Sequence, residues 1–158
     1  MSKVTNEQKM HHFMGIEMNI QTWNLLEKEN RNKQDDVCMV NFAQASLYHW
    51  RKSHKYEPVN EQRGQWMLSR VYAVLDKGKE ALSFANEASR LTNEQDLKDF
   101  DQAYSYEALA RANAALGNKK ECVKWLEKAQ NAATLIKREE DKKYFISDLE
   151  SPPWFDCK

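Results

Sequence analysis

Glycine and proline are scarce in this chain, and no two glycines lie close together. Among 158 residues there are four glycines and three prolines. Loops that cradle phosphate groups and dinucleotide-binding fingerprints both need clustered glycines, because the backbone must approach the ligand closely. The scattered glycines therefore exclude both kinds of nucleotide site.

The chain also has no net charge, since 24 basic residues balance 24 acidic ones. Without a positive field, general binding to nucleic acid or to an anionic membrane surface loses its main physical support. The basic residues of 137–143 are interleaved with acidic ones, which is typical of a solvated helix face. We therefore expect neither nucleic acid nor a membrane as a partner.

Long apolar runs and paired cysteines are also lacking. No run approaches the ~20 residues of a membrane-crossing helix, and the first residues contain no apolar stretch of a signal peptide. Three widely spaced cysteines, Cys38, Cys122 and Cys157, predict reduced thiols rather than a disulfide framework or a zinc site. We expect a cytoplasmic protein with Cys122 in its core and Cys157 exposed in the tail.

The motifs of metal-dependent and nucleophilic enzymes do not occur. The sequence has no Glu-x-x-His, His-Glu-x-x-His or Gly-x-Ser-x-Gly. His11 and His12 are adjacent and point to different sides of a helix, while His49 and His54 are spaced poorly for shared ligation. We expect no metal, no cofactor and no catalytic residue. A metal site built from distant residues such as His11, Glu17 and His49 stays open as an alternative.

The chain does contain a doubled segment, an internal repeat with a spacing of 41 residues: residues 62–91 align with 103–132 without a gap. The identical pairs are Leu68/Leu109, Arg70/Arg111, Ala73/Ala114, Leu75/Leu116, Lys79/Lys120, Glu80/Glu121 and Ala88/Ala129. Each copy has the pattern of a helix, a tight polar turn and a second helix. Such self-similarity is typical of helical repeats.

Helical periodicity runs through almost the whole chain, which predicts an all-α protein. The predicted helices span about 6–29, 36–53, 62–75, 79–91, 93–116, 119–136 and 139–149. Capping boxes are predicted between Thr5 and Gln8 and between Thr92 and Gln95. Gly117 is predicted at a helix C-cap, where a positive φ costs glycine little.

The length suits one domain with a sizeable core. We expect a single domain over residues 1–158, made of an N-terminal helix hairpin (6–57), two repeats (60–92 and 93–136) and a C-terminal capping helix with a tail (137–158). Stacked repeats need covered ends. Trp154 and Phe155 are therefore interpreted as a foldback over the exposed end.

The doubled segment resembles tetratricopeptide repeats, which are helix hairpins of ~34 residues. The matching residues are Leu68, Ser69, Tyr72, Leu75, Ala81, Ala85 and Ala88 in the first copy, and Tyr106, Leu109, Ala110, Leu116, Cys122, Leu126 and Ala129 in the second. Gln65 stands where the family has tryptophan, and Asn113 replaces its aromatic residue. The longer period, which we expect a long helix 93–116 to absorb, also suits HEAT-like arrays, but the alanine-rich second helices favour tetratricopeptides.

The resemblance implies a right-handed stack of antiparallel helix hairpins, about seven helices in all, with a concave groove. The groove-facing positions of the family fall here on Arg63, Trp66, Arg70, Tyr104, Glu107 and Arg111. Arg70 and Arg111 occupy equivalent positions and are expected to be neighbours, so that their guanidinium groups could hold a carboxylate or an acidic peptide. In the alternative interpretation, Glu107 and Arg111 are an ordinary helix pair worth about 0.3–0.5 kcal/mol.

We therefore expect a non-enzymatic module that binds a protein or peptide in its groove. One alternative is a small-ligand-binding protein or enzyme, with Arg63, Arg70, Glu107 and His49 as the first candidates. In another, the chain's own C-terminus fills the groove through Trp154 and Phe155, and the protein is a homodimeric scaffold.

Overall fold

The structure is a computed structural model that describes residues 3–158. Within that range it contains seven α-helices, one short 3-10 helix and no strand, which confirms the all-α prediction. The elements are α1 (Asn6–Leu26), α2 (Lys33–Arg51), α3 (Pro58–Val74), α4 (Gly78–Glu94), α5 (Asp99–Leu116), α6 (Lys119–Leu135), α7 (Glu139–Glu150) and η1 (Phe155–Cys157). No helix in the described range combines the length and apolar character needed to cross a bilayer.

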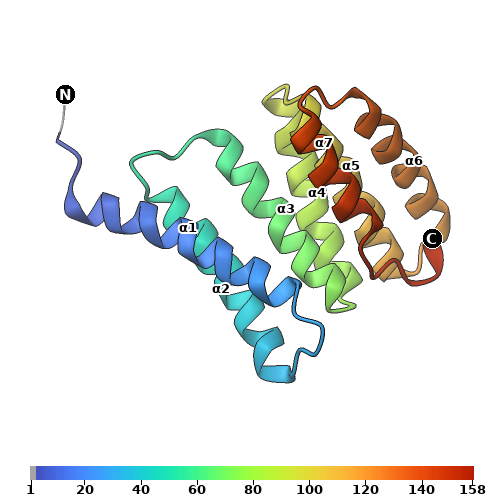
Figure 1. Cartoon of the computed structure of the whole chain (residues 1–158), viewed down its shortest axis with the longest axis horizontal. Coiled ribbons are helices and arrows are strands. Elements are labelled where there is room, and N and C mark those ends of the chain that lie inside the picture. The colour runs from blue at the N-terminus through green and yellow to red at the C-terminus, as the bar shows by residue number, and fades with distance from the viewer. Residues whose placement is uncertain (1–2) are drawn as a thin grey trace.

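Successive helices form hairpins that pack against one another (Figure 1). α1 packs on α2, α3 on α4 and α5 on α6, and the hairpins are joined by contacts of α2 with α3 and of α4 with α5. The first helices of the second and third hairpins, α3 and α5, also touch each other, and α7 packs on α5. The predicted stack of helix hairpins is therefore confirmed.

Local capping explains where several helices begin and end. Thr5 Oγ1 accepts a hydrogen bond from Gln8 N at 3.1 Å, and Thr5 N donates to Gln8 Oε1 at 3.0 Å, which is the predicted capping box. Asn32 and Asp35 form the same arrangement before α2. Gly117 ends α5 with a φ of 78°, as predicted.

The second predicted capping box is wrong. Thr92 lies inside α4, where its hydroxyl donates to the carbonyl of Ala88 at 2.7 Å instead of capping a new helix. α4 therefore continues to Glu94, and α5 begins only at Asp99. The extra length of the repeat lies in α4 and in the link 95–98, rather than in a long fifth helix.

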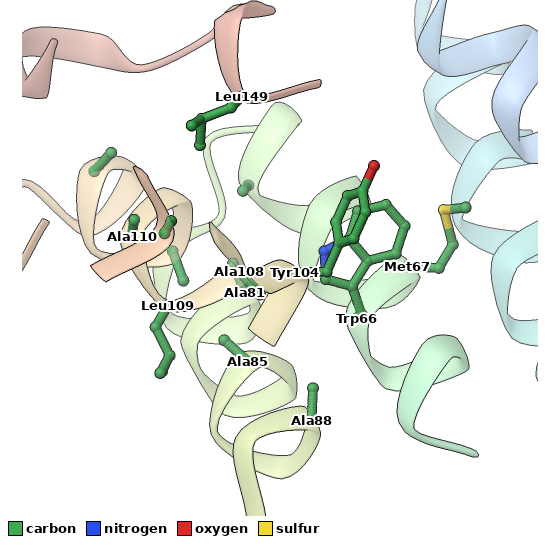
Figure 2. Packing of buried hydrophobic residues seen from close by; sticks show 14 of the residues in the cluster. Trp66, Met67, Ala81, Ala85, Ala88, Tyr104, Ala108, Leu109, Ala110 and Leu149 are labelled. Atoms are coloured by element: carbon green, nitrogen blue, oxygen red, sulfur yellow. The ribbon is translucent and has the colours of Figure 1, made fainter. Parts of the chain in front are cut away.

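Small residues allow the hairpins to approach closely. Ala81, Ala85 and Ala88 lie fully buried along α4 (Figure 2), as the repeat pattern predicts. Gly78 begins α4, and a Cβ placed there would lie 2.5 Å from the backbone nitrogen of Leu116. Glycine is therefore needed where the start of α4 meets the end of α5.

The C-terminal segment corrects the cysteine prediction. Cys122 is buried on α6 as expected, but it forms a disulfide with Cys157. The predictions of reduced thiols and of an exposed Cys157 are therefore wrong, since Cys157 is half-buried. Their separation of 35 residues gave no sign of proximity, because the foldback of the tail creates it. Trp154 is buried in that foldback as predicted, whereas Phe155 remains 39% exposed.

Candidate partner-binding groove

A groove runs between α1 and α7, with α3 and α5 as its floor. Three cavities of about 200, 480 and 430 Å³ lie along it, and Trp23 of α1 lines all three. Figure 1 shows α1 and α7 on either side of α3. The two walls of the groove therefore come from opposite ends of the chain.

Aromatic rings from three helices form the first cavity. The ring centroids of Trp66 and Tyr104 lie 4.8 Å apart in an edge-to-face arrangement (Figure 2), and Trp23 adds a ring 5.9 Å from Trp66. At its rim, the exposed Arg63 donates two hydrogen bonds to Asp101, at 2.8 and 3.1 Å. The cavity therefore has aromatic walls, with the polar side chains of Asn19 and Gln62 in its lining and the ion pair of Arg63 and Asp101 at its edge.

Beneath the groove lies a buried ionic cluster centred on Glu107, which is 0% exposed. Glu107 accepts hydrogen bonds from Trp66 Nε1 at 2.9 Å and from Arg70 Nη1 at 2.8 Å, and also from Arg111 Nε. The structure thus brings the two equivalent arginines together, as expected, but around a carboxylate of the chain itself.

Residues 148–153 accept hydrogen bonds from the other Nη groups of the two arginines, while Arg70 Nε has no acceptor among the described residues. Arg70 Nη2 donates to Ser151 Oγ at 2.8 Å, and Arg111 donates to the carbonyl oxygens of Pro153 and Asp148. The Arg111 guanidinium also lies 4.1 Å from the ring centroid of Trp154. The tail therefore fills the part of the groove that the sequence assigned to an acidic ligand, with Trp154 but not Phe155 as its anchor.

Burial and neighbouring charges oppose each other in this cluster. Burial alone would raise the pKa of Glu107, but the charges of Arg111 and Arg70 outweigh it and hold the pKa below its ordinary value. Burial lowers the pKa of Arg111 to about 10, which leaves the guanidinium charged at neutral pH. Both partners are therefore ionised, and their pairing is internal to the fold.

At the outer side of the groove, Tyr104 donates a 2.5 Å hydrogen bond to a carboxylate oxygen of Asp148. Burial is the main cause of the raised pKa of both Tyr104 and Asp148. The charge of Asp148 and its hydrogen bond with Tyr104 raise the pKa of Tyr104 further. The hydroxyl therefore keeps its proton, and it holds the Asp148 side chain at the edge of the cavity of about 430 Å³.

Sequence reasoning missed an exposed apolar stripe on α1, beside the part of the helix that lines the cavities. Phe13, which is 62% exposed, and the exposed residues Ile16 and Ile20 recur along α1 at the same helical spacing that leads to Trp23. Residues three and four apart share a helix face, so this apolar stripe continues the surface that Trp23 presents to the cavities. The signal in the sequence was the recurrence of apolar residues at spacings of three and four. The structure shows that the buried face of α1 is a different one, formed by His11, Gly15 and Thr22.

The histidines gather at the other end of the α1–α2 hairpin. His11 Nδ1 lies 2.7 Å from His49 Nδ1, and His12 Nδ1 lies 3.0 Å from Ser53 Oγ. Glu17 accepts a hydrogen bond from Gln21 on its own helix. Among residues 3–158 no three histidine, cysteine or acidic side chains are placed to hold a metal ion, so the alternative site at His11, Glu17 and His49 is not formed.

No protein-family model matches the chain, and neither curated proteins nor solved structures give a match. Function is therefore argued from the geometry of the groove.

Proposed function

We propose that this protein is a non-enzymatic recognition module that binds a segment of a partner protein in the groove between α1 and α7. The observation that carries the proposal is the apolar stripe of Phe13, Ile16 and Ile20, which lies exposed on α1 and leads to Trp23 in the groove. Contiguous exposed apolar surface beside a concave site is typical of protein-binding faces. The tetratricopeptide resemblance of the doubled segment supports the same function.

The enzymatic alternative has weaker support. Charged groups in a cleft with shifted pKa values often indicate a catalytic site. Here Glu107 satisfies Arg70 and Arg111, and Arg63 is matched by Asp101. His49 pairs with His11 on the neighbouring helix and lines none of the three cavities along the groove. Each candidate group thus has an internal partner.

The disulfide bears on the expected compartment. The cytoplasmic prediction used the expected reduced thiols together with the lack of a signal-peptide pattern, whereas disulfides persist mainly in oxidising compartments. The bond between Cys122 and Cys157 removes the thiol part of that support.

The proposal can be tested with random ten-residue peptides retained by the immobilised full-length chain. We expect the double variant Ile16→Glu/Ile20→Glu to retain on the order of tenfold less peptide, because two charges on the stripe oppose burial of apolar side chains. Val123→Glu is the matched control, since Val123 is an exposed apolar residue of α6, away from the groove. Circular dichroism would verify that the variants are folded.

Equal retention by the parent and the double variant would overturn the proposed function. So would a loss of the same size in the control.

A further inference from the structure

Acidic and aromatic side chains dominate one of the three cavities of the groove, that of about 430 Å³. The cavity of about 480 Å³ is also lined by Lys28, Arg31 and Arg70, and each of these is paired with an acidic residue of the chain. The cavity of about 430 Å³ is lined by the carboxylates Glu27, Asp141 and Asp148, the rings of Trp23, Phe100, Tyr104 and Tyr144, and Ser147. Among the described residues, no lysine, arginine or histidine lines this cavity. Its charge is therefore of one sign although the whole chain is neutral.

Two of the three carboxylates of this cavity, Glu27 and Asp141, are poorly matched by the protein itself. Glu27 forms no ion pair with any residue of 3–158, and the ion pair of Asp141 is a 3.7 Å contact with the exposed Arg138. The arginines of the groove floor, by contrast, are paired with Asp101 and Glu107. The uncompensated charge that faces a ligand is therefore negative.

The rings add a second preference for a cation. A lysine or arginine side chain is attracted to the face of an aromatic ring, most strongly where water is partly excluded. Tyr144 is 62% exposed on α7, and Trp23 lies on the opposite wall. A basic side chain entering between α1 and α7 would meet ring faces and carboxylates together.

Two buried polar atoms in the linings of the other two cavities suit a peptide better than a free amine. Gln62 is 1% exposed and lines the 200 Å³ cavity, and its Oε1 accepts no hydrogen bond from the described residues. Arg70 Nε, in the lining of the 480 Å³ cavity, likewise has no acceptor in the described chain. A peptide supplies both an N–H donor and a carbonyl acceptor, whereas a polyamine supplies donors alone.

We infer that the groove takes a basic segment of a partner protein, with a lysine or arginine side chain held between Glu27 and Asp141 beside Tyr144. Apolar residues of the same segment lie on the stripe of Phe13, Ile16 and Ile20. The inference rests on the proposed function and names the chemistry of its partner. The inferred ligand has the opposite charge to the ligand expected from the sequence, because the arginines that suggested an acidic ligand pair with Glu107 inside the fold.

The test uses ten-residue peptide libraries in which one position is fixed and the others are random. Libraries fixed as lysine or arginine should be retained about tenfold more than libraries fixed as glutamate or norleucine. The preference should shrink at high salt, which screens accessible charges. It should also be lost in Glu27→Gln/Asp141→Asn, but not in the control Glu80→Gln/Glu127→Gln, which removes two charges from exposed residues of α4 and α6.

The outcomes separate the two ideas. If Ile16→Glu/Ile20→Glu abolishes retention but the libraries show no basic preference, or an acidic one, the inference fails and the proposed function stands. The inference also fails if the basic preference survives in Glu27→Gln/Asp141→Asn. If the Ile16→Glu/Ile20→Glu variant retains as much peptide as the parent, both the proposed function and the inference are overturned.

Discussion

At Glu107, one carboxylate serves donors from both copies of the doubled segment. Trp66 occupies the position in the first copy that is equivalent to Glu107 in the second, and the two side chains are joined by a hydrogen bond. Equivalent positions have thus diverged into a donor and an acceptor, while the arginines one turn later remained identical. Two buried positive charges now depend on one acidic side chain for their pairing.

Replacing Glu107 by glutamine should therefore cost far more than losing one hydrogen bond. The amide side chain would retain the shape but leave two buried guanidinium groups without the carboxylate that pairs with them, so we expect the free energy of unfolding to fall by about 3–5 kcal/mol. Urea unfolding at neutral pH measures this change. The exposed Glu127→Gln on α6 serves as the control and should stay within about 0.5 kcal/mol. A loss below about 1 kcal/mol for Glu107→Gln would show that the cluster does not depend on its negative charge.

At the scale of elements, α1 has one face that packs on a neighbouring helix and another that is exposed. One packs on α2 through Gly15, whose carbonyl accepts a 2.7 Å hydrogen bond from Ser46, and through the histidine pair. The other carries the exposed stripe. Because α1 is held to the rest of the molecule mainly through α2, the stability of this hairpin controls whether the groove keeps its first wall.

The histidines make that hairpin sensitive to acid. Burial, and then the charges of His11 and Lys52, lower the pKa of His49, while burial, His54 and Lys55 lower that of His12. Between the ordinary value of 6.5 and these lowered values, the unfolded hairpin binds more protons than the folded one, so stability is lost as pH falls through that window.

We therefore expect hydrogen-exchange protection of α1 and α2 to decrease from pH 7.5 to 5.5, after correction for intrinsic exchange rates. α5 and α6 contain no histidine and provide the internal control. His49→Gln should reduce the decrease, because it removes one of the protonating groups. Equal protection of α1 and α2 at both pH values would contradict this prediction.

The helices were predictable from the sequence because periodicity, the Thr5 capping box and Gly117 act locally. Thr92 misled because its hydroxyl bonds backward within α4, and the choice between a cap and a helix interior depends on the following residues. The meeting of Arg70 and Arg111 followed from their equivalent positions. The direction of their side chains did not, because it is decided by Glu107 and by a tail that lies far away in the sequence.

At the scale of the whole molecule, the C-terminal segment closes the end of the stack. Trp154 covers Arg111, and the disulfide from Cys157 fastens the segment to Cys122 on α6. The bond closes a loop of 35 residues that includes α7, the second wall of the groove. The disulfide near the C-terminal end of the chain therefore constrains the helix that forms one wall of the groove.

Reduction of this bond should destabilise the protein by up to about 3–4 kcal/mol, the loop-closure entropy returned to the unfolded chain. Urea unfolding with and without dithiothreitol measures the loss, and thiol titration verifies that the bond has opened. Cys157→Ser should match the reduced parent and no longer respond to the reductant. Cys38→Ser is the control, since Cys38 is free. An unchanged midpoint after complete reduction would contradict the prediction.

Because the groove is bounded by α1 and α7, its width depends on the helix junctions between them. A small rotation at the contact of Gly78 with Leu116 would be carried outward by the stacked hairpins, as along a lever, and would open or close the gap between α1 and α7. Affinity for a ligand could thus be tuned by substitutions that never touch it. In such an architecture, selection can act on the distance between α1 and α7 through residues elsewhere in the stack.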